Sequence, residues 1–246
     1  MRNISIDLNN SSPTNGGIFE GWGTSLCWWA NRVGFSEKLT KDSARLFFSK
    51  EDGLGLNIMR YNIGGGDDPT HNHIKRTDSE MPGWWKYDEE TKDFVFNSDT
   101  DKNQLAVLLE AYRASGDDAY VEAFSNSPPY YMTVSGCSSG GKNPLANNLK
   151  KSQIVPFAEY LARVCDYIQT NCGIKIKSLA AMNEPFTNYW RYLSEKQEGC
   201  HVSPGRMQSS VLVATYNALR ERNLTDIIVT ASDETNTKKQ YYSLKN

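Results

Sequence analysis

The stretch "IKIKSLAAMNEP", residues 174–185, decides the fold class and points to a functional site. Residues 174–182 are rich in β-branched and apolar side chains, which predicts a buried strand. A segment with helical periodicity precedes this strand at 152–172, and another at 203–223 leads to the next apolar run at 226–232. Strands that alternate with helices are typical of a parallel sheet covered by helices, so the sequence predicts an α/β fold.

The same alternation extends toward the N-terminus. Apolar runs bounded by turn residues predict three further strands, at 18–26, 56–63 and 119–126. Helical periodicity predicts helices at 40–50 and 103–116, and a long polar loop follows the strand at 56–63. We expect the strands to be apolar on both faces, as in a sheet buried between helices.

Bulk composition excludes several classes of protein. The chain has 246 residues, of which 39% are hydrophobic, enough for one large domain or two small ones. Lys and Arg number 27 and Asp and Glu 29, so the net charge of −2 gives no basis for binding nucleic acid or an anionic membrane. No apolar run reaches the roughly 20 residues of a membrane helix, and residues 1–17 lack the apolar core of a signal peptide. A neutral ligand fits this composition, and we expect a monomer.

Several aromatic side chains lie in loop-like sequence instead of at core periodicity. Examples are "LCWWA" (26–30), "PGWWKY" (82–87), "PPYYM" (128–132) and "TNYWRY" (187–192). Aromatic rings presented from loops suit flat, partly apolar ligands, and sugar rings are the commonest of these. The alternative is that these rings close the ends of a large core.

Polar side chains follow four of the predicted strands at their carboxyl ends. In parallel α/β folds these ends meet at one edge, where functional groups gather. The polar residues are Arg60 and Asn62, then Asn126, then Asn183 and Glu184, and finally Asp233 and Glu234. Capping alone does not account for four polar strand ends, so we expect a binding site there, with Asn126 among its residues.

The residue types at these ends suit acid–base chemistry. A carboxyl group beside an apolar wall is harder to ionise, so we expect Glu184 to hold a proton near neutral pH and to act as a general acid. The amide of Asn183 can bind a substrate hydroxyl group. Arg60 supplies a fixed positive charge that can keep a nearby carboxylate ionised and oriented.

Five motifs in order resemble glycoside hydrolase family 30, most closely its endo-β-1,6-galactanases. They are "GWGTSLCWW" (21–29), "LNIMRYNIGGGD" (56–67), "SNSPPYYM" (125–132), "LAAMNEP" (179–185) and "QEGCH" (197–201). The resemblance runs from about Ile18 to the end of the chain. It implies a (β/α)8 TIM barrel with a small β-sandwich at its side, and cleavage of β-1,6-galactan side chains of arabinogalactan by a retaining double displacement. It also implies an extracellular or secreted enzyme without a cofactor, acting on a polysaccharide or oligosaccharide.

The resemblance assigns roles to individual residues. Glu184 matches the family's acid/base, Asn183 its hydroxyl-binding amide, and Arg60 the basic residue beneath the catalytic pair. Asp67 corresponds to a sugar-contacting aspartate and Tyr131 to an aromatic residue beside the cleaved sugar. Further substrate-binding residues are placed by loop alone: Trp28, Trp29, Trp190 and His201.

Retaining hydrolysis needs a second carboxyl group, about 5–5.5 Å from the first. In the family it comes from the seventh strand, whereas this sequence predicts five strands. We therefore expect a barrel truncated after about the fifth strand and a nucleophile beyond Asn246. Residues 18–246 would form the incomplete barrel, and 1–17, with the strand "NISIDLN", would belong to the side β-domain. Glu234 is an alternative nucleophile, but we expect it to bind substrate or to support Glu184.

Two other functions remain open from the sequence. One is a related β-glycanase or β-glycosidase with another sugar preference, such as β-1,6-glucan, xylan or a β-glucoside. The other is a carbohydrate-binding barrel that lacks the nucleophile and does not catalyse.

The remaining motifs predict structure more than chemistry. "HNH" at 71–73 has no third ligand nearby in the sequence, so we expect a solvated turn and no metal site. "GGGD" at 64–67 is not followed by Lys and Ser or Thr, so it is not a phosphate-binding loop. Cys137 and Cys200 follow neighbouring strands, which makes a disulfide between them geometrically possible.

Overall fold

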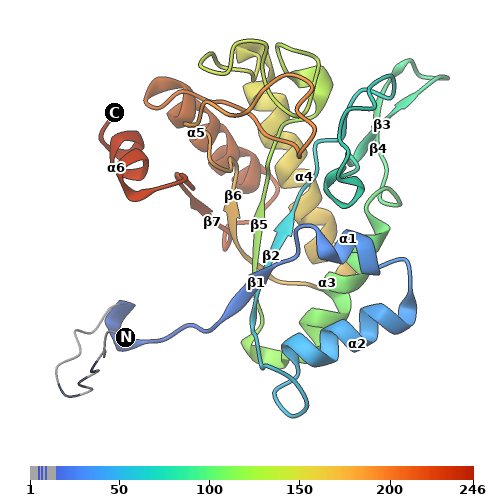
Figure 1. The fold of residues 1–246 in the computed structure, drawn as a ribbon, viewed down its shortest axis with the longest axis vertical. Coiled ribbons are helices and arrows are strands. Elements are labelled where there is room, and N and C mark those ends of the chain that lie inside the picture. Colours follow the sequence, from blue (N-terminus) through green and yellow to red (C-terminus); the bar gives the residue numbers. More distant parts are fainter. Residues whose placement is uncertain (1–4, 6, 8, 10–14) are drawn as a thin grey trace.

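The computed structural model describes residues 5, 7, 9 and 15–246. The predicted strand at 3–9, and with it most of the predicted side-domain segment 1–17, falls mainly outside these residues. The described chain forms one five-stranded sheet, a two-stranded hairpin and the helices that pack beside them (Figure 1). No helix in this part of the chain is long and apolar enough to cross a membrane.

The central sheet is parallel, as predicted, and its strands follow chain order. Its members are β1 Gly23–Ser25, β2 Ile58–Asn62, β5 Tyr120–Phe124, β6 Ile176–Ala180 and β7 Ile228–Thr230, in the order β1-β2-β5-β6-β7. Each strand lies within one of the five predicted apolar runs. β1 and β7 are the edges of this sheet, so the described residues form an α/β sheet that is not closed, and the eight-stranded barrel stays a prediction.

Helices lie at the four positions where helical periodicity predicts them, and two shorter helices, at 29–33 and 237–245, were not predicted. The α-helices are α1 Trp29–Val33, α2 Glu37–Phe48, α3 Lys102–Ser115, α4 Ile154–Cys172, α5 Arg206–Glu221 and α6 Thr237–Lys245. Short 3-10 helices lie at η2 Asn15–Gly17, η3 Thr77–Ser79, η4 Gly116–Asp118, η5 Tyr130–Met132 and η6 Lys151–Gln153. α2 begins earlier than predicted because Ser36 caps it, its hydroxyl oxygen accepting a hydrogen bond from the backbone N–H of Leu39.

The two faces of the central sheet differ, which corrects the prediction of strands apolar on both faces. Met59, Tyr61, Val121 and Ala123 are fully buried in the core. The intervening residues on these strands are polar or half-buried, and the parallel register places Arg60 beside Glu122 and Glu122 beside Ser178. Alternation along a strand sends neighbouring side chains to opposite faces, so the face bearing Arg60 is polar.

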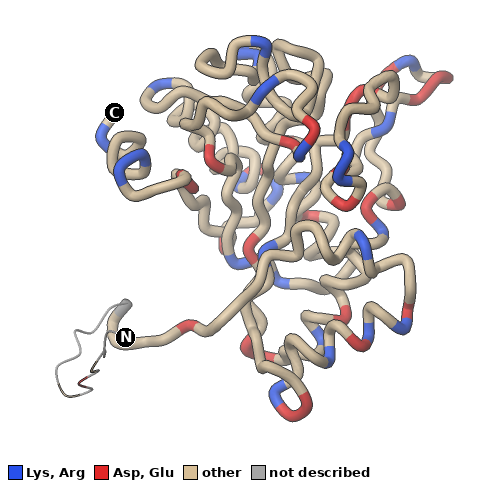
Figure 2. Tube along the Cα trace, viewed as in Figure 1, with Lys and Arg blue, Asp and Glu red and all other residues tan. Residues whose placement is uncertain are grey.

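The predicted polar loop after β2 contains an antiparallel hairpin instead. Its strands are β3 Trp85–Asp88 and β4 Asp93–Phe96. Trp84, just before β3, is fully buried and stacks on Phe96 at 5.7 Å between ring centroids. The aromatic side chains of 84–96 thus anchor this hairpin against the core. Lys and Arg are interspersed with Asp and Glu along the chain (Figure 2), so the trace carries no extended basic stripe in its described part.

Candidate functional site

A cluster of charged and amide side chains is built from the middle of two strands and from the segments that directly follow two others. We call it the Arg60 cluster and define it as Arg60, Glu122, Asn183 and Asp233. Arg60 Nε donates a 2.7 Å hydrogen bond to Glu122 Oε1, because the β2–β5 register sets these residues side by side. The Arg60 guanidinium carbon lies 3.5 Å from the ring centroid of Phe124, which supports the side chain from below.

The other end of the Arg60 guanidinium reaches the segments that follow β6 and β7. Arg60 Nη2 donates to Asn183 Oδ1 at 3.2 Å and also pairs with Asp233 Oδ2. Asn183 and Asp233 are partners in an isolated parallel bridge, so the backbone itself holds them side by side. Burial raises the pKa of Asp233, while the positive charge of Arg60 opposes that rise. One arginine therefore links groups from β2, β5, β6 and β7.

Glu184 lies next to this cluster in an unusual backbone conformation. Its φ is 47°, in the left-handed region that costs a non-glycine residue about 1–3 kcal/mol. Its backbone N–H donates to the Asp233 carbonyl oxygen at 2.6 Å. The half-buried side chain accepts a hydrogen bond at Oε2 from the hydroxyl of Tyr189. Burial and this bond to Glu184 raise the pKa of Tyr189, so its hydroxyl keeps its proton and acts as a donor.

The loop that follows Glu184 is fixed by Trp190. Its indole Nε1 donates a 3.0 Å hydrogen bond to the Glu184 carbonyl oxygen, and its side chain is nearly fully buried. The Trp190 ring packs directly on Gly199, where a Cβ atom would lie 2.0 Å from the ring. Only glycine fits at position 199, so "QEGCH" contributes close packing beneath the loop that carries Tyr189.

An aromatic cleft lies between the hairpin and the loops after β2 and β5. Its volume is about 590 Å³. It is lined by side chains of the hairpin and of η5, together with the backbone of the glycine loop after β2: Gly65, Gly66, Asp67, Pro69, Glu80, Met81, Pro82, Gly83, Trp85, Lys86, Tyr87, Glu89, Phe94, Tyr130 and Tyr131. Tyr131 stacks on Phe94 with ring centroids 3.6 Å apart. This combination of aromatic faces and polar edges suits a sugar chain.

The aromatic cleft is not lined by four other predicted binding residues: Trp28, Trp29, Asn126 and His201. Trp29 packs on the core and donates from its indole Nε1 to the Ser25 carbonyl oxygen at 2.8 Å, and the guanidinium of Arg76 lies over the ring of Trp28. Asn126 and His201 are almost fully buried. Their predicted contacts with substrate stay predictions.

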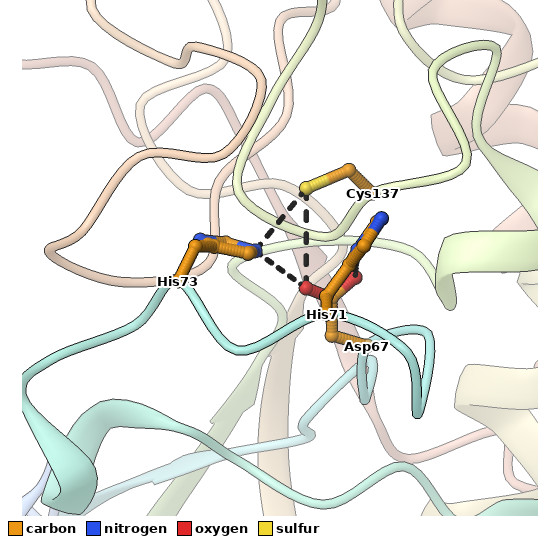
Figure 3. A group of neighbouring side chains, drawn as sticks. All are labelled: Asp67, His71, His73 and Cys137. Carbon is orange, nitrogen blue, oxygen red and sulfur yellow. Dashed lines mark hydrogen bonds and ion pairs between the residues drawn. The ribbon is translucent and has the colours of Figure 1, made fainter.

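The histidines at 71 and 73 do not form the solvated turn that we predicted. His73 Nε2 lies 2.6 Å from Asp67 Oδ2, and His71 Nδ1 lies 3.3 Å from Asp67 Oδ1 (Figure 3). Cys137, from the loop after β5, brings its sulfur within 3.4 Å of His73 Nε2. These side chains form a second group, the Asp67 cluster, defined as Asp67, His71, His73 and Cys137. The prediction failed because Asp67 was not counted as a third ligand, and because the fourth member of the cluster, Cys137, is far away in the sequence.

The disulfide between Cys137 and Cys200, which the sequence left possible, does not form. All five cysteines lie in the described part of the chain, and all are free. Cys137 faces His73, whereas the Cys200 thiol lies toward the His201 carbonyl oxygen at 3.8 Å within the core. Neighbouring strands brought the two loops to the same edge, but the side chains take different directions.

Sequence reasoning missed three acidic or hydroxyl groups near the site: Glu122, Tyr189 and Glu198. Glu122 lies inside a strand rather than at its end, and Tyr189 was seen only as part of an aromatic loop. Glu198 is buried and accepts hydrogen bonds at Oε1 from the backbone N–H groups of Gly65, at 2.9 Å, and Gly66, at 3.1 Å. A charged residue inside "QEGCH" was the available signal for Glu198.

Two known proteins are similar to this chain in sequence. An endo-beta-1,6-galactanase from Hypocrea rufa is 30% identical over 93% of this chain and 49% of its own length. An exo-beta-1,6-galactobiohydrolase from Bifidobacterium longum subsp. longum is 27% identical over 92% of this chain and 20% of its own length. The chain therefore spans half or less of the length of these two relatives.

Solved structures support the fold. A conserved exported protein from Bacteroides fragilis has a TM-score of 0.76 at 19% identity, over 88% of this chain and 44% of that one. The catalytic domain of xylanase C from Talaromyces cellulolyticus has a TM-score of 0.64 at 18% identity, over 92% and 49%. The family model of O-glycosyl hydrolase family 30 matches residues 2–243. As the sequence motifs predicted, the chain belongs to O-glycosyl hydrolase family 30 and is similar to its endo-β-1,6-galactanase.

Proposed function

We propose that this chain carries the acid/base part of the active site of a retaining endo-β-1,6-galactanase. The observation that supports this most is the position of Glu184 at the carboxyl edge of the sheet. Its carboxyl group is half-buried and oriented by Tyr189, and the Arg60 cluster lies directly beside it. A positioned carboxyl group next to fixed charges is what proton transfer to a leaving glycosidic oxygen requires.

In this proposal each residue has a defined task. Glu184 gives its proton to the departing glycosidic oxygen and later takes a proton from the attacking water. Asn183, held by Arg60, uses the N–H groups of its amide to bind a sugar hydroxyl group. Arg60 keeps the surrounding carboxylates ionised and fixed in position. Double displacement also needs a carboxylate nucleophile on the opposite side of the sugar.

Glu234 is poorly suited to be that nucleophile. Its two carboxylate oxygens accept hydrogen bonds from the Phe186 backbone N–H, and Oε1 also accepts from Ser243 Oγ at 2.8 Å and from Gln208 Nε2 at 3.3 Å. A carboxylate held by that many donors is a weak nucleophile and a good anchor. Because Phe186 lies two residues after Glu184, Glu234 supports the acid/base segment. We therefore keep the proposal that the nucleophile lies on a later strand, beyond Asn246.

The substrate class rests on the relatives and on the aromatic cleft. The two sequence relatives are named for action on β-1,6-linked galactose chains. The cleft at the hairpin has the aromatic faces that a galactan chain would stack on, and Tyr131 is in its wall. A polymeric substrate and an exported structural relative together support a location outside the cell.

The test is a Glu184→Gln variant of the full-length protein. We expect its turnover of β-1,6-galactan to fall by about 10²–10⁴, because general acid–base catalysis is lost. An aryl galactoside with a good leaving group needs no proton, so it should still form the glycosyl-enzyme, and added azide should restore its turnover. Undiminished hydrolysis of galactan would refute the role of Glu184.

A substrate panel tests the specificity separately. β-1,6-Galactan, β-1,6-glucan and xylan are offered to the wild-type enzyme, and NMR follows the configuration of the first product. We expect β-configured galacto-oligosaccharides from the first polymer only. Preference for glucan or xylan would move the chain to a related β-glycanase, and binding without hydrolysis of any polymer would favour a carbohydrate-binding barrel.

A further inference from the structure

The Asp67 cluster joins two loops at the carboxyl edge of the sheet. Asp67, His71 and His73 come from the loop after β2, and Cys137 comes from the loop after β5 (Figure 3). One possible ligand atom of each side chain lies within 4.8 Å of all the others. All four are largely buried, with 9% exposure for the Asp67 and His73 side chains and 17% for His71, while Cys137 is fully buried. The proposed acid/base chemistry does not use this group, although Asp67 also lines the aromatic cleft.

The tautomer of His73 is set by its other nitrogen. His73 Nδ1 lies 2.7 Å from the Ser194 backbone carbonyl oxygen, which can only accept a hydrogen bond, so Nδ1 carries the proton. In a neutral ring Nε2 then presents a lone pair. That lone pair faces Asp67 Oδ2 at 2.6 Å and the Cys137 sulfur at 3.4 Å. Electron-donating atoms this close need a proton or a metal ion between them.

A surrounding set of hydrogen bonds holds the donor atoms in place. Asp67 Oδ1 accepts from the Ser138 backbone N–H at 3.0 Å. Ser139 Oγ lies 3.2 Å from the Cys137 sulfur, and the same hydroxyl donates to the Arg191 carbonyl oxygen and accepts from the Ser194 backbone N–H. A histidine whose second nitrogen donates to a carbonyl oxygen, beside ligands fixed by outer hydrogen bonds, is the usual arrangement at protein metal sites.

The types of ligand atom in the Asp67 cluster, and the distances between them, indicate which metal ion fits. We propose that Asp67, His71, His73 and Cys137 bind one divalent transition-metal ion of the zinc type. Two imidazoles, one thiolate and one carboxylate suit zinc, whereas calcium and magnesium prefer oxygen ligands alone. Zinc–ligand bonds of about 2.0–2.3 Å in a tetrahedron place ligand atoms roughly 3.3–3.8 Å apart. The Cys137 sulfur lies 3.9 Å from Asp67 Oδ2 and 3.4 Å from His73 Nε2, and both separations are close to this. The 2.6 Å pair of His73 Nε2 and Asp67 Oδ2 would open on binding, whereas His71 Nδ1 lies 3.3 Å from the other Asp67 oxygen, Oδ1.

The role of the ion is structural in this inference. Four protein ligands complete a tetrahedron and leave no position for water or substrate. Through Ser139 and Ser194 the site is also connected to the loop after β6, which carries Tyr189 and Trp190 beside Glu184. The metal would therefore fasten three loops around the cleft. This inference does not depend on the proposed glycosidase activity.

Metal analysis of the full-length protein is the first test. The protein is stripped with a chelator, dialysed against zinc and analysed for metal by mass spectrometry. We expect about one zinc per chain and a Tm rise of about 5–10 °C at a free zinc concentration near a hundred times Kd. With cobalt(II) in place of zinc we expect tetrahedral visible bands and a thiolate-to-cobalt charge-transfer band in the near ultraviolet.

Variants identify the ligands. Cys137→Ser should lose the charge-transfer band and most of the zinc, and His73→Ala should lose the zinc-dependent rise in Tm. Cys172→Ser, which changes a half-buried thiol at the end of α4, is the matched control and should keep both. If a ligand variant does not fold, the zinc content and the zinc-dependent Tm of the wild-type protein still test the proposal. Wild-type protein that takes up no more zinc than Cys137→Ser, with an unchanged Tm, would show that hydrogen bonds alone hold the cluster together and would overturn the proposal.

Discussion

The Arg60 cluster and the Asp67 cluster lie at the same edge of the sheet, but water reaches them very differently. In the Arg60 cluster the side chains of Arg60 and Glu122 are about a quarter exposed, and that of Asp233 is 43% exposed. In the Asp67 cluster exposure falls to 9% at Asp67 and His73. The charges of the first cluster can therefore exchange water for a polar substrate, whereas the groups of the second are largely shielded from water and face one another, although Asp67 also lines the aromatic cleft.

The origin of this difference is the backbone that carries each cluster. Strands and the segments that directly follow them carry the Arg60 cluster, and the register of the parallel sheet sets its geometry. Loops that pack on one another carry the Asp67 cluster, and side chains such as Ser139 set its geometry. The Arg60 cluster thus rests on the strands of the sheet, and the Asp67 cluster joins two of the loops that follow them.

The largest effect is expected from breaking the Arg60 cluster. Arg60→Ala leaves Glu122 and Asp233 without their common partner, and it removes the group that orients Asn183. We expect kcat/KM on β-1,6-galactan to fall by about 10³. Stability should fall by about 2–3 kcal/mol, less than for a fully buried pair because the cluster is partly solvated. Steady-state kinetics and urea unfolding measure the two quantities.

Arg113→Ala is the matched control for this variant. Arg113 is an exposed arginine on α3 that pairs with Glu110 on the same helix. Its loss should change stability by less than about 1 kcal/mol and leave the kinetics unchanged. Equal losses in the two variants would mean that the Arg60 cluster has no special role.

The stability of the folded chain should also depend on pH, through the buried carboxyl group of Glu198. Glu198 underlies the glycine loop that leads into Asp67, and burial raises its pKa from the ordinary 4.5 to about 8. Between these values the folded state holds a proton that the unfolded state has lost, so the stability contributed by protonation is lost as pH rises toward 8. The loss is about 3 kcal/mol between pH 5 and pH 8.

Glu198→Gln tests this linkage. The amide oxygen can still accept from the Gly65 and Gly66 N–H groups, but the side chain no longer ionises. Urea unfolding at pH 5 and pH 8 should therefore show a smaller decline for the variant than for the wild type. Parallel declines in the two proteins would contradict the prediction.

The sequence was sufficient to predict the strands, most helices and the family. Apolar runs and helical periodicity are local signals, so the five parallel strands and the helices α2 to α5 were located to within a few residues. The hairpin at 85–96 was missed because its two short strands lie among polar and turn-forming residues. The ordered motifs predicted family 30, which the family match confirmed.

Side-chain partners could not be predicted in the same way. Arg60 was expected to lie near a carboxylate, but its partner Glu122 follows only from the β2–β5 register. A disulfide from Cys137 to Cys200 was left possible because topology brings their loops to one edge, whereas packing turns the Cys137 sulfur toward His73. The "HNH" segment was expected to be a solvated turn because Asp67, four residues before His71, was not recognised as a third ligand, and because Cys137 joins from a distant loop. Contacts of this kind depend on the direction of each side chain, which local sequence does not encode.

The weakest effect that we expect is at Tyr189, where a substitution should lower kcat but hardly change stability. Tyr189 is 42% exposed and donates its hydroxyl hydrogen to Glu184 Oε2. Tyr189→Phe removes one hydrogen bond to an ionisable group, so we expect kcat on β-1,6-galactan to fall about tenfold with little change in KM. The Tm should move by less than about 3 °C, because the ring stays and its packing on Trp190 is kept. Tyr216→Phe, an equally exposed tyrosine on α5, is the control and should match the wild type in both. A Tyr189→Phe enzyme with full kcat would mean that Glu184 is oriented by its strained backbone alone.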